Sequence, residues 1–422
     1  MKVYLVGGAV RDSLLKLSIH DKDWVVVGSS IKKLLKKKFK QVGKDFPVFL
    51  HPVSYEEYAL ARTEYKSGKG YIGFKTDFNA NITLEEDLKR RDLTINAIAK
   101  DKYGNFIDPF LGIRDLKLKI LRHVSPAFEE DPLRVLRVAR FAASFSRFGF
   151  IIAKKTMVLM KKIVNSNELL HLKGERIWKE TEKALNTINP QIYFKVLEMC
   201  GAIFVLFPEI YQLYLFSSIC FYHNNYCSYM KKIFRNLSYI SKKTKELEIR
   251  FLFLFCCFDY FPFFLKKKDI IEIYNKNHIF LIKNFCKRLN ISNVIRDFCI
   301  IIIKNYIFLK NIKSQSSEKI INFFNSIDAW RNFDRIKKIV FLMNLNFLSK
   351  TENYYHDVIN TIKKGDFLFS IYLISKNVSV KSIVSSGFKG INIRNELFRL
   401  RVLVVENWRK SLFIQNKKYC FF

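Results

Sequence analysis

The 422-residue sequence predicts an α+β segment at the N-terminus followed by a long, all-helical remainder. Up to about residue 120, short apolar runs with strand-like patterns alternate with turns and helices. From about residue 121, Pro and Gly become rare and apolar residues recur at helical spacing, as in Leu133, Leu136 and Val138. Because 49% of the residues are apolar, the chain has enough apolar surface for more than one core, and we expect two to four domains.

Four strands are expected in the first segment, and they cover residues 2–6, 24–28, 46–51 and 57–62. Between the second and third lies the lysine-rich run 31–40, which we interpret as a helix with Ile31, Leu34, Leu35 and Phe39 on one face. Its lysines are interpreted as the solvated face of that helix.

The charge balance predicts a polyanionic partner. Lys and Arg number 73 against 38 Asp and Glu, which gives a formal net charge of +35. Such an excess favours nucleic acid or an anionic membrane surface. A compositional bias towards Phe, Lys, Ile and Asn, with only 15 Gly and 8 Pro, also contributes to this charge.

Neither a membrane span nor a secretory signal is expected. The longest apolar stretch, 251–265, contains Asp259 and Pro262 and is shorter than the roughly 20 residues that a spanning helix needs. The eight cysteines include no CxxC pair, so we interpret them as small buried hydrophobes in a reducing compartment. The sequence therefore predicts a soluble, cytoplasmic protein.

The first 30 residues combine groups suited to nucleotide chemistry. Gly7 and Gly8 lie at a strand-to-helix turn, where phosphate oxygens can approach backbone N–H groups, and Arg11 follows in the first turn. Asp21 and Asp23 are two residues apart at a strand start, so both carboxylates are expected on one face of the sheet. Such a pair can hold two Mg²⁺ ions roughly 3.5–4 Å apart.

This composite resembles the DNA polymerase β-like nucleotidyltransferases. The resemblance becomes specific to class II CCA-adding enzymes (tRNA nucleotidyltransferases), in particular the multifunctional γ-proteobacterial type with a degenerate HD domain. It covers nearly the whole chain. The matching motifs are GGAVRD (7–12), DKDWVVVG (21–28), RRDLTINAIA (90–99), DPFLGIRDL (108–116), EEDPLRVLRVARFAA (129–143), FPEI (207–210), SIDAWR (326–331) and GFKGINIR (387–394).

The resemblance implies Mg²⁺-dependent, template-independent addition of the 3′-terminal CCA to tRNA from CTP and ATP. It further implies four domains: a catalytic head (1–120) with a polymerase β-like mixed sheet, then a helical neck (121–207), body (208–320) and tRNA-binding tail (321–422). It leaves the oligomeric state open.

The family motifs also imply roles for further residues. Arg91 matches the position that contacts the sugar and phosphates of the nucleotide, and since adjacent residues point apart, only one of Arg90 and Arg91 is expected to face it. Glu57 matches the third acidic position, with Glu56 and Glu64 as nearby alternatives. The segment 67–73, rich in Gly and Ser, is the candidate flexible loop.

Asp131 and Arg134 are the candidates for choosing the base. Cytosine and adenine share an amine donor beside an unprotonated ring nitrogen, and a carboxylate beside a guanidinium complements that pair. Asp131 would accept from the amine and Arg134 would donate to the ring nitrogen. Arg137 and Arg140 continue the cationic line towards the triphosphate. The alternative interpretation makes Asp131 a helix N-cap followed by Pro132 at the first helical position.

The chain departs from multifunctional relatives in the middle region. Their metal-dependent HD phosphohydrolase domain needs an adjacent His-Asp pair, but Cys256-Cys257 stand at that place. His223 and His278 lie in the region but far apart, and the His356-Asp357 pair is interpreted as incidental. We expect a helical scaffold without phosphohydrolase activity.

Two alternative functions share features of this sequence. A poly(A) polymerase, or an enzyme that adds only part of CCA, shares the motifs of the first 140 residues. A catalytically silent tRNA-binding protein would also be basic, but it has no reason to keep the six residues Gly8, Arg11, Asp21, Asp23, Asp131 and Arg134 together.

Overall fold

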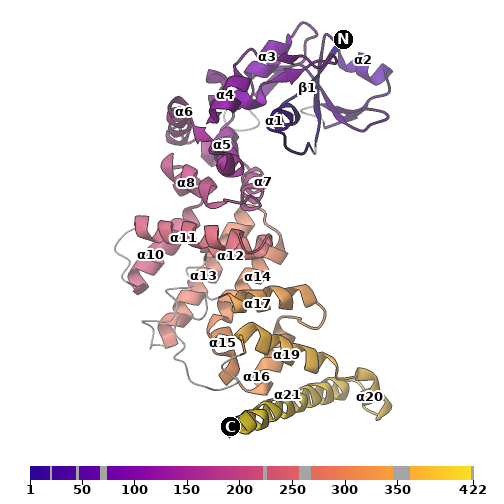
Figure 1. Cartoon of the computed structure of the whole chain (residues 1–422), viewed down its shortest axis with the longest axis vertical. Coiled ribbons are helices and arrows are strands. Elements are labelled where there is room, and N and C mark those ends of the chain that lie inside the picture. The colour runs from indigo at the N-terminus through magenta and orange to yellow at the C-terminus, as the bar shows by residue number, and fades with distance from the viewer. Residues whose placement is uncertain are drawn as a thin grey trace. The chain divides into compact units, whose positions relative to one another are not determined.

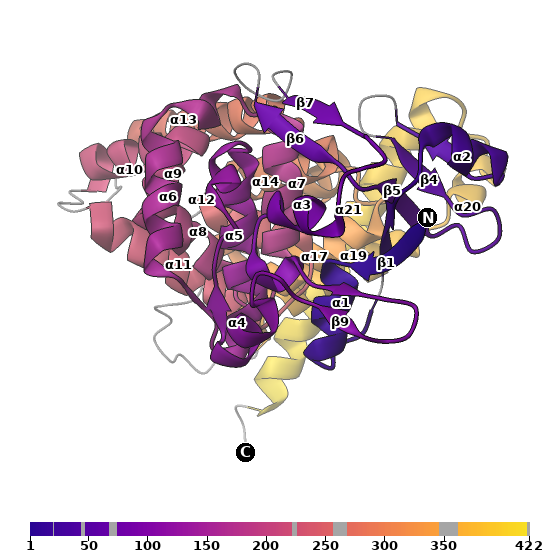
Figure 2. The same ribbon diagram turned by 90° about the horizontal axis from the view of Figure 1, so that it is seen from above.

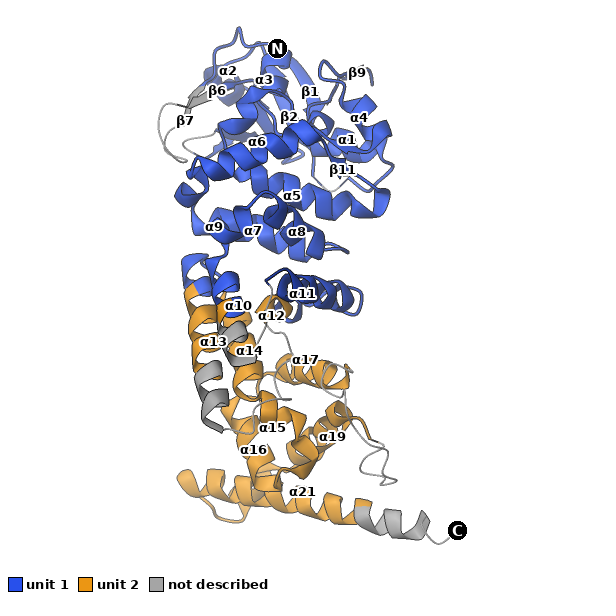
Figure 3. Ribbon diagram, turned by 90° about the vertical axis from the view of Figure 1, so that its left-hand side faces the viewer, with its two compact units in different colours: residues 1–214, 225–250, 285–291 blue, residues 215–224, 251–284, 292–422 orange. Residues whose placement is uncertain are grey.

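A computed structural model describes residues 1–19, 21–43, 47–66, 74–221, 226–255, 268–345 and 362–419. Contacts between Cα atoms divide the chain into two compact units (Figure 3). The first holds residues 1–214, 225–250 and 285–291, and the second holds residues 215–224, 251–284 and 292–422. The expected loop at 67–73, Cys256-Cys257, His223 and His356-Asp357 lie outside the described residues.

The N-terminal α+β segment is built on a seven-stranded mixed sheet (Figure 1). Its strands follow the order β3-β4-β5-β2-β1-β8-β9, in which β2 and β5 are parallel and the other neighbours antiparallel. The predicted strands are present, with slightly different ends. The strands of this sheet are β1 (Lys2–Val6), β2 (Asp23–Val27), β3 (Lys40–Val42), β4 (Val48–Leu50), β5 (Glu57–Leu60), β8 (Ala99–Lys100) and β9 (Phe106–Ile107).

Both faces of the central strands are covered, which explains the unbroken apolar run at the end of β2. Val25 packs with Val6 and Leu88 in one core cluster, and Val26 packs with Leu34 and Phe49 in another. Because successive side chains of a strand point to opposite faces, two covered faces require apolar residues at every position.

The lysine-rich helix is shorter than predicted and differs in one apolar position. Helix α2 spans Ile31–Lys36, and the chain then forms β3 from Lys40. Leu34 and Phe39 are buried, but Leu35 is 46% exposed, so its assignment to the packed face was wrong. Leu34 is the one buried residue of this described helix, because six residues make less than two turns.

Two further strand pairs lie outside the main sheet. Strands β6 (Thr63–Lys66) and β7 (Phe74–Asp77) form an antiparallel pair that Figure 2 shows as a separate ribbon. Strands β10 (Ile120–Leu121) and β11 (Ile151–Ile152) form a short parallel pair. These two-residue strands are below the length at which periodicity signals a strand, and the sequence did not predict them.

The remainder is helical, as predicted. Helix α5 packs against both α7 and α8 and so forms the centre of the helical part of the first unit. The helices are α1 (Gly8–Leu14), α3 (Leu84–Lys89), α4 (Gly112–Leu118), α5 (Leu133–Phe145), α6 (Lys154–Asn165), α7 (Gly174–Leu185), α8 (Gln191–Met199), α9 (Ala202–Leu206), α10 (Pro208–Phe221), α11 (Tyr226–Ser241), α12 (Leu247–Phe255), α13 (Lys268–Arg288), α14 (Asn293–Lys304), α15 (Tyr306–Lys310), α16 (Ser317–Ser326), α17 (Phe333–Asn344), α19 (Lys364–Lys376), α20 (Val380–Ser385) and α21 (Ile391–Tyr419).

Cysteine burial and apolar helix length were also part of the sequence predictions. Cys200, Cys286 and Cys299 are buried as expected, whereas Cys227 is exposed, so not every cysteine is a core residue. One described stretch, residues 364–385, meets a length and hydropathy criterion for a membrane span. It consists of α19 and α20, with 13 and 6 residues, and each is shorter than the roughly 20 that a span needs.

Candidate active site

A cleft of about 690 Å³ in the first unit collects nearly all the predicted site residues. Its walls come from the turn after β1, the start of β2, the segment after α3, and helices α5 and α7. Nine cationic and five acidic side chains line it. The predicted residues that line the cleft are Gly8, Arg11, Asp21, Asp23, Arg91, Asp131, Arg134, Arg137 and Arg140; Glu57 does not line it.

The acidic edge of the cleft lies where three strands run side by side. Asp23 opens β2, where it pairs with Val6 of β1 on one side and with Glu57 of β5 on the other. Residues paired directly across neighbouring strands place their side chains on the same face, so Glu57 is next to Asp23 on the sheet. Asp21 precedes the strand, so strand alternation does not orient it, but it lines the same cleft.

The neighbouring Glu56 is engaged elsewhere. Its carboxylate accepts hydrogen bonds from Lys22 Nζ (3.1 Å) and Trp24 Nε1 (2.9 Å). The bond from Lys22 lowers the pKa of Glu56, with a further contribution from Trp24. Of the alternatives for a third carboxylate, this contact set argues against Glu56. The side chain of Glu64 lies outside the described part of the chain.

The turn between β1 and α1 brings backbone and arginine together. Gly7 has a φ of 70°, and a Cβ on it would lie 2.9 Å from Arg91 Nη1, so this position requires glycine more strictly than Gly8 does. Arg11 is buried above the rings of Phe141 and Phe145. Its guanidinium donates to both carboxylate oxygens of Asp12 at 2.9 Å and to Asn96 Oδ1 at 2.7 Å. Burial lowers the pKa of Arg11, and Asp12 partly offsets this shift.

Both Arg90 and Arg91 line the cleft, which corrects the prediction that only one of them would. Helix α3 ends at Lys89 and Arg90 is its C-cap, so the pair does not lie in regular structure that forces neighbours apart. The buried carboxylate of Asp87 binds Arg90 Nη2 at 2.6 Å and Arg91 Nη2 at 3.2 Å. Burial alone would raise the pKa of Asp87, but the two arginines lower it overall.

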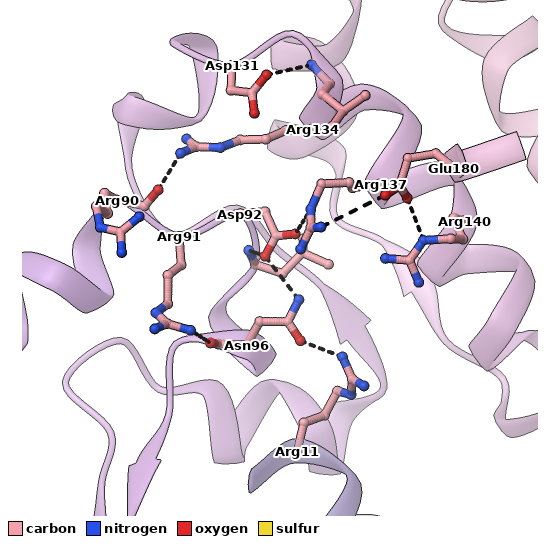
Figure 4. A network of polar contacts seen from close by, with 12 residues as sticks. Arg11, Arg90, Arg91, Asp92, Asn96, Asp131, Arg134, Arg137, Arg140 and Glu180 are labelled. Atoms are coloured by element: carbon pink, nitrogen blue, oxygen red, sulfur yellow. Dashed lines mark hydrogen bonds and ion pairs between the residues drawn. The ribbon is translucent and has the colours of Figure 1, made fainter. Parts of the chain in front are cut away.

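Asp92 and Glu180 bind the two arginines Arg137 and Arg140 of α5 (Figure 4). Asp92 accepts from Arg137 Nε at 2.7 Å, from Asn96 Nδ2 at 3.0 Å and from its neighbour's backbone N–H. Glu180, which comes from α7, accepts from Arg140 Nε at 2.5 Å and lies 4.0 Å from Arg137 Nη1. Burial would raise the pKa of Asp92, but Arg137 and Asn96 hold it well below its usual range.

The two carboxylate oxygens of Asp131 have different partners, one in the local backbone and one in the cleft. Oδ1 accepts from the backbone N–H of Leu133 at 3.0 Å, which supports the chain at the entrance to α5, although Pro132 rather than Asp131 is the N-cap. Oδ2 lies 3.3 Å from Arg176 Nη2 on α7. The N-cap alternative is therefore only partly right, because Asp131 fixes the local chain without being the cap itself.

Arg134 is buried next to Asp131 and is oriented by backbone carbonyls. Nη1 donates to the carbonyl of Ala127 and Nη2 to that of Arg90. A guanidinium carries five N–H donors in one plane, so two carbonyl bonds fix that plane relative to the cleft. Arg134, Arg137 and Arg140 all line the cleft, as their three-residue spacing on α5 predicted.

Several residues of this site were not predicted. Asp92 lies inside a quoted motif, and its place directly after two arginines was an available signal. Asp87 lies three and four residues before Arg90 and Arg91, and this helical spacing was an available signal. Arg176 and Glu180 gave no signal, because their partners are brought to them by the fold, and Lys183 lies in none of the motifs. Arg176 and Glu180, for example, are 45 and 40 residues from Asp131 and Arg140 along the chain.

The middle of the chain holds no metal-binding group among its described residues. No cluster of three or more His, Cys, Asp or Glu suited to a metal ion was found there or elsewhere in the described ranges. His278 is fully buried, and its Nε2 bonds to the carbonyl oxygen of Phe255. Burial lowers its pKa to about 4. His278 is thus placed as a neutral core residue.

Family models match two parts of the chain. Residues 3–122 match a model described as "Poly A polymerase head domain", and residues 149–213 match one described as "Probable RNA and SrmB- binding site of polymerase A". The cleft's acidic edge and its Arg90–Arg91 segment fall within the first match.

The chain also resembles known proteins over its whole length. The CCA-adding enzyme of Buchnera aphidicola subsp. Acyrthosiphon pisum (strain Tuc7) is 51% identical over 432 residues and covers 100% of both chains. Among solved structures, the Thermotoga maritima CCA-adding enzyme complexed with tRNA has a TM-score of 0.56 and 21% identity, covering 97% of this chain and 91% of the other. A complex of a CCA-adding enzyme with ATP has a TM-score of 0.57 and 23% identity, covering 96% and 86%.

Proposed function

The chain belongs to the family of CCA-adding enzymes, and we propose that it builds and repairs the 3′-terminal CCA of tRNA from CTP and ATP without a template. The observation that carries this proposal is the 51% identity to a CCA-adding enzyme from end to end. The nucleotide cleft supports it independently, because nine cations around two exposed carboxylates suit a triphosphate and a metal.

Nucleotidyltransferases of this kind typically use a divalent metal, and we propose Mg²⁺ held by Asp21 and Asp23, with Glu57 as the third carboxylate. The other cleft carboxylates, Asp12, Asp92 and Asp131, are bound to arginines. None of the ion pairs within the described ranges engages Asp21 or Asp23, so their oxygens fit a hard cation. Bound there, Mg²⁺ would lower the pKa of the attacking tRNA 3′-hydroxyl and neutralise charge on the triphosphate.

The chain's own residues would position the nucleotide. The turn at Gly8 brings backbone N–H groups to the phosphates, and Arg11, Arg91, Arg137 and Arg140 supply positive charge around them. Each of these arginines is oriented by a carboxylate before substrate arrives. Such preorganised charge lowers the cost of stabilising the α-phosphate as the 3′-hydroxyl attacks and pyrophosphate leaves.

We propose that Asp131 and Arg134 select cytosine and adenine by their shared donor–acceptor edge. The Asp131 carboxylate accepts from the exocyclic amine, and the Arg134 guanidinium donates to the ring nitrogen. Uracil and guanine would place a donor against the guanidinium and an acceptor against the carboxylate. Buried mismatches of this kind reject wrong substrates strongly.

The remaining assignments of the chain are also proposals. We assign the head, neck, body and tail to residues 1–120, 121–207, 208–320 and 321–422, and we place the protein in the cytoplasm. The body is proposed to have lost phosphohydrolase activity. His278 supports this view, since a neutral imidazole bonded to a backbone carbonyl in the core is not poised for metal binding.

The decisive experiment supplies tRNA lacking CCA with labelled CTP alone, ATP alone and both. A CCA-adding enzyme incorporates CMP from CTP alone and finishes with AMP when both are present. A poly(A) polymerase incorporates no CMP, and a silent tRNA-binding protein incorporates neither nucleotide.

The matched variants are Asp21→Ala and Glu85→Ala. Loss of a metal ligand removes several kcal/mol of transition-state stabilisation, so Asp21→Ala should lose about 10²-fold or more in CMP incorporation while still binding tRNA. Glu85 is an exposed carboxylate of α3 outside the cleft, and its variant should keep full activity. Full activity of Asp21→Ala would contradict the metal assignment but not the family's reaction.

A further inference from the structure

A second groove in the first unit, separate from the nucleotide cleft, is lined by basic side chains. Helices α8 and α11 pack against each other and border a hollow of about 420 Å³. Lys195 of α8 faces it, together with Lys231 and Arg235 of α11 and Lys242 just beyond that helix. We name these four residues the α8–α11 basic groove. None of them lines the nucleotide cleft.

The cations of the groove contrast with those of the nucleotide cleft. Six arginines of the cleft form ion pairs with buried or half-buried carboxylates: Arg11, Arg90, Arg91, Arg137, Arg140 and Arg176. All four groove cations are exposed, and across the described ranges no ion pair joins any of them to a carboxylate. The acid nearest in sequence is Glu198, three residues after Lys195 on α8, which is half-buried. Lys195 interacts electrostatically with this carboxylate, so the uncompensated positive charge that the groove presents to solvent lies on Lys231, Arg235 and Lys242.

The length of the array indicates the kind of ligand. Lys231 and Arg235 are four residues apart on α11, and Lys242, seven residues further on, directly follows the last residue of the helix. At 1.5 Å per residue the row extends over roughly 16 Å. One phosphate or one nucleotide would meet only part of such a row. A polyanion with charges repeated along a backbone can meet all of it.

The other face of α11 argues against a membrane surface. Met230, Ile233, Leu237 and Ile240 are buried in the first unit, so the helix has no free apolar face to insert among lipids. Exposed Tyr239 lies on the groove side and adds an aromatic surface of the kind that RNA-binding sites use.

We propose that the α8–α11 basic groove binds the phosphodiester backbone of tRNA and so holds the substrate outside the nucleotide cleft. This inference rests on the proposed function for the identity of the RNA. It also gives these four cations, which are part of the net charge of +35, a specific binding role instead of a general electrostatic attraction to RNA.

The test compares two triple variants with equal loss of charge. Lys231→Ala/Arg235→Ala/Lys242→Ala removes three cations of the groove, and Lys32→Ala/Lys33→Ala/Lys36→Ala removes three exposed lysines of α2 as the matched control. Alanine is the best helix former, so these exposed substitutions should preserve the helices. If the groove triple variant fails to fold by circular dichroism, the corresponding Gln variants take its place.

The main measurement is the salt dependence of tRNA binding. Each lost phosphate contact should reduce the slope of log affinity against log salt by about 0.7–0.9, so the groove variant should lose about 2–3 in slope. At physiological salt its KM for tRNA should rise between about tenfold and a hundredfold. Its kcat at saturating tRNA and its KM for CTP should equal those of the unaltered protein.

Three results would overturn the proposal. Equal slopes for the groove variant and the unaltered protein would do so, as would equal reductions in the two triple variants, which indicate a diffuse field. Unchanged tRNA affinity with groove-dependent retention on phosphatidylserine vesicles would assign the groove to a membrane. An unaltered protein that binds tRNA but incorporates no CMP would contradict the proposed function, while its salt slope would still test the groove.

Discussion

Replacing Asp92 with asparagine removes one negative charge from the centre of the arginine network while keeping the side-chain shape. Asp92 is 5% exposed and accepts three hydrogen bonds, of which the one from Arg137 Nε, at 2.7 Å, joins two charged groups. The amide would keep an acceptor for Asn96 and for the backbone, but it would turn a donor towards Arg137. The variant therefore neutralises one partner of a buried ion pair and leaves the charge of Arg137 in place without that partner.

The cost can be bounded from these contacts. A hydrogen bond to a charged group contributes about 1.5–3 kcal/mol, and breaking a buried ion pair costs about 3–5 kcal/mol. Arg137 is about one-third exposed and lies near Glu180, so water and that carboxylate recover part of the loss. We expect the variant to destabilise the first unit by about 2–4 kcal/mol at pH 7.

The pH dependence gives the sharper test. The pKa of Asp92 is held well below its usual range in the folded protein, so its contribution is present above the unfolded pKa of about 3.9 and is lost as pH falls through the folded value. The difference between the two proteins should therefore be complete at pH 7 and should shrink below about pH 4. Since a chain of this length is not expected to unfold in one step, hydrogen exchange of peptides from α5 and residues 92–100 is the suitable measurement.

The matched control is Asp21→Asn, an exposed carboxylate of the same cleft with no arginine partner within the described ranges. It should change stability by less than about 0.5 kcal/mol. A stability loss below about 0.5 kcal/mol for Asp92→Asn at pH 7, or a loss that persists undiminished below pH 3, would refute the reasoning.

Three further predictions concern selection, packing and protonation. Asp131→Ala should reduce the preference for CTP and ATP over UTP and GTP by about 10²-fold or more in kcat/KM. Arg176→Ala should reduce this preference less, because Arg176 contacts the selecting carboxylate and is not itself proposed to contact the base. Equal effects of the two variants would contradict this. Gly174→Ala should destabilise the first unit by about 1–3 kcal/mol, because the new Cβ would overlap the carbonyl oxygen of Arg288. Unchanged hydrogen exchange in α7 would exclude that packing. The buried neutral His278, with its pKa lowered to about 4, should cost the second unit about 3 kcal/mol as pH falls from 6.5 to 4, and a His278→Gln variant should show a flatter stability profile over that range.

The order of strands and helices could be read from the sequence where the pattern was long or wholly apolar. The strand 2–6 matches β1 at both ends, and the run at the end of β2 reflects a sheet covered on two faces. Short elements such as β8, β9 and β10 have two residues each, so their partners and not their own sequence define them. Leu35 was misplaced because α2 ends within two turns.

The candidate site was predictable where one motif carried both partners of an interaction. Arg134, Arg137 and Arg140 share one face of α5, so their common direction follows from spacing. The carboxylates that orient them could not be found in the same way. Glu180 and Arg140 meet only because α5 and α7 pack together, and local sequence carries no record of that contact. Arg90 and Arg91 were assigned opposite directions because the end of α3 was not foreseen.

The two bonds of Asp131 have an evolutionary consequence. One oxygen supports the backbone where α5 begins, and the other faces Arg176 in the cleft. A substitution of Asp131 removes a support from the start of the helix that carries three cleft arginines, in addition to any effect on the proposed choice of base. Selection for a folded protein alone therefore resists loss of Asp131, so the proposed base-selecting carboxylate is retained together with the fold, even in a sequence rich in Lys, Ile, Asn and Phe.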